Sequence, residues 1–251
     1  MSQDIIKSED NYPSNDYKSS ISHLIELRKR LMNSLIFFFI TFCITFYFSG
    51  KIFHFLSEPL LRFLPNDGKL IATDITAPVI MPIKLSLFTS FMLNLPFLIY
   101  QIWKFVSPAL YKHERKSILP ITITSLFLFF IGMSFAYYLV FPLMFNLFID
   151  VLPPDVTLMT DINNYLDFVI KMLIIFGMTF QIPCIIILLL KFNVLDIETI
   201  IKARPYYIIG AFVISMILTP PDVLSMILLA LPICALIELA VLLGKIIIKN
   251  K

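Results

Sequence analysis

The chain has 251 residues, of which 59% are hydrophobic and 15% are charged, and its mean hydropathy is +0.88. Soluble globular proteins carry about 25% charged residues, so the composition excludes a soluble domain and indicates an all-α membrane protein with several spans. The formal net charge is only +3, and the basic residues are spread over loops, which argues against binding to nucleic acid.

Residues that commonly form metal or catalytic sites are scattered through the chain. The cysteines lie in three different apolar runs without partners at the spacing of metal ligands, and the histidines are equally dispersed. The sequence shows no glycine-rich phosphate loop, no nucleophile beside a base and no pair of intramembrane acids. We therefore expect no metal site, no cofactor and no enzymatic activity.

Polar residues divide the chain into three regions. We expect a polar, disordered cytoplasmic tail over residues 1–21, a membrane domain over 22–244, and a basic cytoplasmic tail over 245–251. No small-residue cleavage site follows the first apolar run, which argues against a cleavable signal peptide. The membrane domain contains six predicted transmembrane helices: Leu31–Phe48, Ile83–Val106, Ile118–Phe145, Tyr165–Phe192, Pro205–Leu218 and Val223–Leu243.

The connections between these spans differ in length. The first, Ser49–Pro82, holds a short amphipathic piece, Ile52–Leu64, which we expect Pro59 to interrupt. The others are predicted as loops, the longest being Ser107–Ser117, Asn146–Asn164 and Asn193–Arg204.

Lysine and arginine are distributed unequally between the two sides of the membrane. They concentrate in the N-terminal segment, the second and fourth connections and the C-terminal tail, whereas the other side receives only Lys51, Arg62 and Lys69. Because cytoplasmic loops carry an excess of these residues, the bias predicts that both termini are cytoplasmic.

The last two predicted spans are short. Residues Tyr206–Leu218 would cover about 20 Å at about 1.5 Å per residue, whereas the hydrocarbon core of a bilayer is about 30 Å thick. In the sixth span, Glu238 shortens the purely apolar part. Either polar residues at the helix ends complete the crossing, or the bilayer is thinner beside this hairpin.

Two glutamates stand among basic residues on the predicted cytoplasmic side. Glu26 lies in SHLIELRKRL, immediately before the first span, and Glu114 lies in LYKHERK, between spans two and three. A solvated loop charge is the simpler interpretation of either residue alone. Two carboxylates on one side, kept ionised by neighbouring arginines, could instead each bind a guanidinium of a basic peptide. The neighbouring arginines are Arg28, Arg30 and Arg115.

Several polar residues lie within the predicted spans. Asp167 and Lys171 are four residues apart and are predicted to pair along one helix face. Gln181 and Glu238 must face protein or water, either in helix–helix hydrogen bonds or in a polar concavity. A secondary transporter with Gln181, Lys171 and Glu238 as a midplane site is an alternative function, although no internal repeat supports it.

Several strings of the sequence, in order from about Ser22 to Leu243, resemble the TatC family, the multi-span core of the twin-arginine protein translocase. They are HLIELRKRL (23–31), ATDITAPVIMPIKLS (72–86), FVSPALYKHERK (105–116), IGMSFAYYLVFP (131–142), GMTFQIP (177–183) and RPYYIIGAFVISMILTPPDVLS (204–225).

The resemblance implies a six-span, glove-like bundle in the bacterial cytoplasmic membrane. It implies a receptor and scaffold that binds twin-arginine signal peptides of folded cargo and forms a larger complex, with several copies of this chain. It further implies TatA- and TatB-type single-span partners and export driven by the proton-motive force.

The resemblance also carries residue roles. Glu26 and Glu114 match the acids associated with the arginine pair, and Arg28 lies in the same N-terminal string. Residues expected to frame the peptide pocket are Phe105, Leu110, Tyr111 and Arg115. Functionally sensitive positions in the spans or on the far side match Pro59, Tyr137 and Asp222. Gln181 departs from the family, since many relatives carry glutamate there, and an amide can donate and accept hydrogen bonds but cannot titrate.

Overall fold

The computed structural model describes residues 14–62, 70–106, 112–151, 153, 159–191, 196–218 and 223–249. Nearly all of them are helical. The elements are α1 (Ser14–Tyr47), α2 (Ser49–Leu61), α3 (Ala77–Val106), α4 (Lys112–Phe135), the π-helical turn η2 (Ala136–Val140), α5 (Phe141–Asp150), α6 (Ile162–Thr179), α7 (Ile182–Lys191), α8 (Ile197–Lys202), α9 (Arg204–Leu218) and α10 (Val223–Lys249).

Five stretches of the described chain are long and apolar enough to cross a membrane, which confirms a helical membrane protein. They are Arg28–Tyr47, Ala77–Gln101, Thr122–Asp150, Ile162–Leu190 and Met226–Lys245. The predicted fifth span corresponds to α9, a shorter apolar helix of 15 residues. The prediction of two short final spans therefore holds for α9 and is wrong for α10, which has 27 residues.

Several predicted element boundaries are wrong. Helix α3 begins at Ala77 and includes Pro82 as its sixth residue; a proline there removes one hydrogen bond, which this helix of 30 residues tolerates. Helix α8 occupies a segment predicted as a loop, and α5 extends to Asp150. Helix α1 begins at Ser14 and α10 ends at Lys249, so regular helix extends into both predicted tails.

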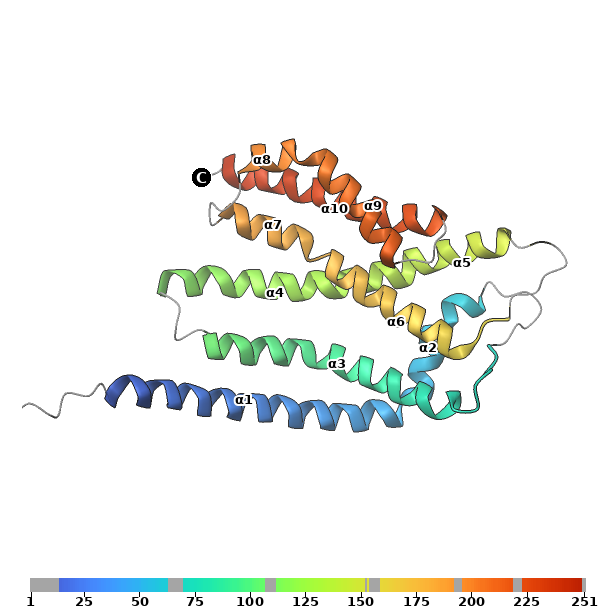
Figure 1. Ribbon diagram of the computed structural model, residues 1–251, viewed down its shortest axis with the longest axis horizontal. Helices are drawn as coiled ribbons and strands as arrows, with labels where there is room; N and C mark the ends of the chain where they lie inside the picture. Colours follow the sequence, from blue (N-terminus) through green and yellow to red (C-terminus); the bar gives the residue numbers. More distant parts are fainter. Residues whose placement is uncertain are drawn as a thin grey trace, which may run out of the picture.

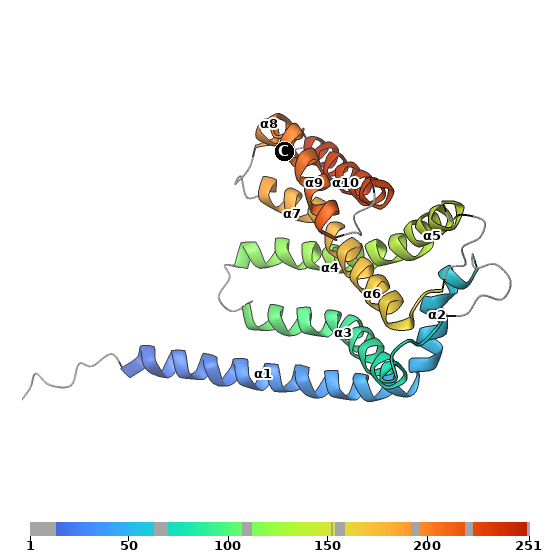
Figure 2. The same cartoon turned by 45° about the vertical axis from the view of Figure 1, so that its right-hand side comes forward.

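The helices form a layered arrangement in which α1, α3 and α4 run side by side (Figures 1 and 2). Helix α1 packs mainly along α3, α4 packs on α6, and α10 packs on α7 and α9. Helix α2 crosses the layer at the end where α1 stops, and it contacts α3 and α5. The opposite end holds the last turn of α3 and the first turn of α4.

The core lies where α2, α3, η2–α5 and α6 meet. Its fully buried side chains include Leu85, Phe141, Met144, Leu166 and Phe176. The outer surface of α1 is apolar and exposed, as expected for a helix that faces lipid or another membrane helix.

Two glycines allow α4 and α6 to approach closely. A Cβ atom at Gly132 would lie 2.6 Å from the carbonyl oxygen of Phe176, and one at Gly177 would lie 2.7 Å from the Phe129 ring. Small residues at such crossings let membrane helices pack backbone against backbone.

Candidate functional site

The two sequence segments that carry the candidate glutamates lie at the same end of the bundle. Glu26 belongs to the N-terminal half of α1, and Glu114 with Arg115 belongs to the first turn of α4. Phe105 lies in the last turn of α3, at that same end. The side chains of these four residues lie outside the described part of the structure, as do Leu110 and Tyr111 entirely.

A contact between α1 and α3 links these segments. The Arg30 guanidinium donates a hydrogen bond from Nη1 to the carbonyl oxygen of Gln101, at 3.4 Å. Arg30 lies one helical turn after Glu26, and Gln101 lies one turn before Phe105. Arg28, on the same segment of α1, is exposed. The backbone therefore brings the Glu26 and Phe105 segments together.

At the other end, Pro59 and Tyr137 together determine the hydrogen bonding of one backbone carbonyl, that of Phe55. Pro59 lies inside α2 and does not interrupt it, contrary to the prediction. Proline has no N–H, so the carbonyl of Phe55, four residues earlier, loses its helical donor. The Tyr137 hydroxyl donates to that carbonyl at 2.6 Å, and the aromatic rings of Tyr137 and Phe55 stack with centroids 4.6 Å apart.

A second tyrosine holds the next residue of α2. The Tyr165 hydroxyl donates to the carbonyl of Leu56 at 2.7 Å, and this contact is buried. Tyr137 comes from η2 and Tyr165 from α6, so hydroxyl groups of two different elements fix one turn of α2. The π-helical turn also shifts the register of the helix at Tyr137, which is a common feature of functional positions.

Gln181 forms a reciprocal pair of hydrogen bonds within the chain. Its Nε2 donates to the carbonyl of Ser125 at 3.0 Å, and the Ser125 hydroxyl donates back to Gln181 Oε1. Gln181 sits at the break between α6 and α7, and Ser125 belongs to α4. This reciprocal pair joins two membrane helices without a charge, which agrees with the presence of an amide at this position.

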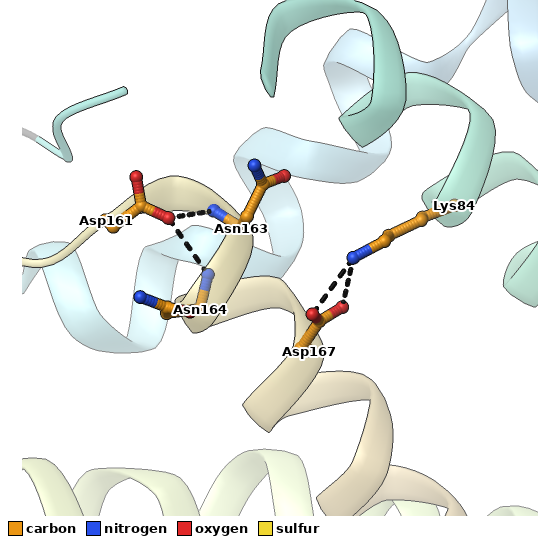
Figure 3. A network of polar contacts seen from close by, with 5 residues as sticks. All are labelled: Lys84, Asp161, Asn163, Asn164 and Asp167. Atoms are coloured by element: carbon orange, nitrogen blue, oxygen red, sulfur yellow. Dashed lines mark hydrogen bonds and ion pairs between the residues drawn. The ribbon is translucent and has the colours of Figure 1, made fainter. Parts of the chain in front are cut away.

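Asp161 organises the loops at the α2 end of the bundle. Its carboxylate caps α6 by accepting from the backbone N–H groups of Asn163 and Asn164 at 2.9 and 3.1 Å (Figure 3). It also accepts from Thr73, at 2.6 Å from the hydroxyl and 3.0 Å from the backbone N–H. The Thr73 hydroxyl and these amides hold the pKa of Asp161 at about 2. A parallel bridge between Ile71 and Asp161 ties the same two loops together.

Asp167 pairs with a residue other than the one predicted. Lys84 Nζ lies 2.7 Å from its carboxylate, so the ion pair joins α3 to α6 (Figure 3). The predicted pairing with Lys171 along α6 is therefore wrong, and Lys171 is exposed. The interhelical partner was not recognisable, because sequence spacing identifies only neighbours within one helix.

The three residues of the transporter alternative do not form a common site. Glu238 accepts hydrogen bonds from Arg204 at 2.8 Å and from the Tyr207 hydroxyl, which joins α10 to α9. Gln181 bonds with Ser125 on α4, and Lys171 belongs to another part of α6. Among the described side chains, no three histidine, cysteine, aspartate or glutamate residues gather as a metal site.

A polar seam joins α1 and α3. The sequence interpretation recognised Asn94 as a polar residue within a span but did not predict its partners on α1. Asn94 is fully buried and donates to the Thr41 hydroxyl at 2.6 Å, and Thr45 donates to the carbonyl of Ser86 at 3.2 Å. The signal was present in the sequence: Ser86, Ser90 and Asn94 recur at intervals of four, as do Thr41 and Thr45. Such spacing places polar groups on one helix face.

Comparison with known proteins identifies relatives over most of the chain. The profile of the TatC family, described as Sec-independent protein translocase protein (TatC), matches residues 22–232. The TatC protein of Escherichia coli K12 is 45% identical over 226 residues, which cover 90% of this chain and 88% of the relative. The TatC protein of Haemophilus influenzae is 44% identical over 225 residues, with the same two shares.

The fold is similar to that of solved structures. A crystal structure described as the twin-arginine translocase receptor TatC superposes with a TM-score of 0.73 at 37% identity, over 89% of this chain and 98% of that one. A second crystal structure of that receptor, in DDM, gives a TM-score of 0.75 at 37% identity, over 88% and 99% of the two chains.

Proposed function

Since the chain belongs to the TatC family of Sec-independent protein translocase proteins, we propose that it binds the twin-arginine signal peptides of folded precursor proteins at the α1–α3–α4 end. It is a transport protein of the bacterial cytoplasmic membrane and not an enzyme. With TatA- and TatB-type single-span partners, and as several copies in one complex, it exports these precursors using the proton-motive force.

In this proposal Glu26 and Glu114 each accept one arginine of the signal peptide. A carboxylate and a guanidinium form a planar, bidentate, charge-assisted pair, and adjacent arginines therefore require two acids near one another. Phe105, Leu110, Tyr111 and Arg115 frame the pocket, and Arg28 keeps Glu26 ionised. The contact between Arg30 and Gln101 carries the proposal, because it joins the α1 segment of Glu26 to the end of α3.

The topology that goes with this function has six spans, both termini in the cytoplasm and a concave face. The concentration of lysine and arginine at the α1–α3–α4 end supports this orientation. Helix α9 is the sixth crossing element, and its 15 residues extend only about 22 Å. A bilayer thinned beside α9 would lower the barrier that folded cargo meets.

The remaining sensitive residues act away from the peptide pocket. Pro59 and Tyr137 hold α2 in place across the α2 end of the bundle. Gln181 joins α4 to α6–α7 and contacts a partner helix or cargo by hydrogen bonding, without titrating. Asp222, which lies outside the described residues, acts on the periplasmic side.

Site-specific photocross-linking tests the proposed peptide site. A photoreactive residue at position 26, 105 or 114 should cross-link to a precursor with two adjacent arginines, and substitution of both arginines by lysine should weaken the product. Glu26→Ala and Glu114→Ala should each abolish cross-linking from position 105, with membrane insertion intact. Glu198→Ala, an exposed acid on α8, is the matched control. Undiminished cross-linking in both variants would contradict the site.

A further inference from the structure

A cavity of about 500 Å³ opens between α2, α3, α4–η2 and α6. This volume lies within the range of about 300–1,000 Å³ that small-molecule sites occupy. The cavity belongs to the α2 end of the bundle, far from the segments of Glu26 and Glu114. The peptide site proposed above makes no use of it.

Its wall is apolar and comes from every surrounding helix. The side chains that form it include Phe88, Met92, Phe130, Met133 and Leu173. Thr89 and Ser134 each add an aliphatic hydroxyl group to this surface, beside the two tyrosines that also line it. Such a wall favours a hydrocarbon ligand that carries a few polar groups near one end.

The charge of the cavity is unbalanced. Lys51 is the single charged residue among those that line it, and its Nζ lies 5.5 Å from the centre of the Phe48 ring. The one acid of α2, Glu58, is engaged by Arg62 at 2.6 Å. A positive group beside an apolar wall without a neighbouring carboxylate attracts an anion whose remainder is apolar.

The level of Lys51 matches that of lipid headgroups. It lies in the first turn of α2, immediately beyond the end of the α1 span. Two tyrosines near this level, Tyr47 and Tyr138, are 84% and 71% exposed. Exposed tyrosines mark the membrane–water interface, where phosphate groups lie and from which acyl chains extend inward.

The volume excludes a whole helix as the occupant. An α-helix with its side chains is about 10 Å wide, and a cylinder of that width fills 500 Å³ in about 6 Å, little more than one turn. A single acyl chain is narrow enough to extend along the cavity instead.

We propose that this cavity binds one acyl chain of an anionic phospholipid, with its phosphate on Lys51 and its ester groups near the Thr89 and Ser134 hydroxyls. The net negative headgroup matters because the lining residues offer a zwitterionic lipid no counter-charge for its ammonium. The proposal concerns a structural lipid and is independent of the peptide site.

Native mass spectrometry of the purified chain tests the proposal. The protein in detergent is offered equal amounts of dioleoyl phosphatidylglycerol and dioleoyl phosphatidylethanolamine, and the lipids retained per chain are counted. The wild type should retain phosphatidylglycerol at least fivefold over phosphatidylethanolamine. Lys51→Gln should abolish this preference, whereas Lys202→Gln, which removes the same charge from an exposed residue of α8, should preserve it.

A second variant tests the cavity itself. Ser134 is exposed at the cavity wall, so Ser134→Phe adds a ring there without overpacking the core, and it should reduce retention of the lipid severalfold. Equal retention of the two lipids by the wild type, or an unchanged preference in Lys51→Gln, would overturn the proposal. Retention of a peptide in place of lipid would also overturn it, as would undiminished lipid retention by Ser134→Phe.

Discussion

The hydroxyl of Tyr137 replaces, at 2.6 Å, the helical hydrogen bond that Pro59 cannot donate to the carbonyl of Phe55. The two residues are far apart in sequence, yet Tyr137 supplies to the Phe55 carbonyl oxygen the donor that Pro59 lacks. A proline inside α2 is therefore tolerated only while η2 presents this hydroxyl.

Tyr137→Phe should lower the free energy of unfolding by about 1–3 kcal/mol, because the Phe55 carbonyl is then left without a donor. In the Pro59→Ala background the same substitution should cost less, since an alanine at that position restores the N–H donor. Denaturant unfolding of the purified protein measures this double-mutant cycle. Tyr138→Phe is the control, because that side chain is 71% exposed. Additive effects would contradict the shared acceptor.

Gly132→Ala should destabilise the protein by about 1–3 kcal/mol through overpacking. The new methyl group would approach the Phe176 carbonyl oxygen to 2.6 Å, and a backbone atom cannot move aside easily. Gly177→Ala should cost less, because the Phe129 ring that it meets can rotate. Gly210→Ala has open space around its Cβ and is the control. Thermal unfolding that ranks the three variants otherwise would refute this account.

Asp161 should make the loops at the α2 end sensitive to acid. Its folded-state pKa of about 2 is below the ordinary value of 3.8, so its contribution to stability is fully present above about pH 4. The contribution is lost as the pH falls through the folded-state pKa toward 2. Hydrogen exchange of the Ile162 amide, which bonds to the carbonyl of Ile71, should report this loss. In Asp161→Asn the protection should not change over that pH range.

Glu26→Gln and Glu114→Gln should reduce binding of a twin-arginine peptide nearly as much as the alanine variants do. The amide retains the shape of the carboxylate but loses the charge of the bidentate pair. Peptide affinity measured at two salt concentrations distinguishes the loss of the charge from a loss of shape, since only the interaction of the charged pair is screened by salt. Glu198→Gln should behave like the wild type, and full affinity in either pocket variant would refute the ionic pair.

The bilayer should be thinner beside α9 than beside α1. Spin labels at Tyr206 and Ile217, which are exposed near the two ends of α9, should both report headgroup depth, about 17 Å apart. Labels at Leu31 and Tyr47, near the ends of the α1 span, should report a greater separation of the two interfaces. If one end of α9 lies deep in the hydrocarbon, the bilayer is not thinned and the prediction is wrong.

The centres of the spans could be predicted because long apolar runs have few alternatives to a membrane helix. Helix ends could not, since Pro82 was taken as the end of a loop and Pro59 was expected to interrupt the amphipathic piece of residues 52–64. In each case the helix continues, and at Pro59 the missing hydrogen bond is supplied by a tyrosine from a distant part of the sequence. Compensation of this kind depends on tertiary structure, which local patterns do not contain.

The candidate site was likewise predicted only in part. The positions of Glu26 and Glu114 on one side followed from the charge bias of the loops, and their helical segments do lie at one end of the bundle. The partner of Asp167 was predicted incorrectly, because Lys84 reaches it from another helix. Asp161 was not singled out, although an acid directly before a helical stretch is a recognisable capping signal.

The polar seam between α1 and α3 also fixes the rotation of α1 about its own axis. Thr41 and Thr45 face α3 within the last third of the α1 span, and successive residues of a helix are offset by about 100° around its axis. A slip of one residue would turn both hydroxyls into lipid and leave Asn94 facing hydrocarbon. Since α1 is a continuous helix from Ser14 to Tyr47, such a rotation of the helix would also move Glu26 to a different position around the axis. The contacts of Thr41 and Thr45 with α3 therefore fix the rotation of the helical segment to which Glu26 belongs.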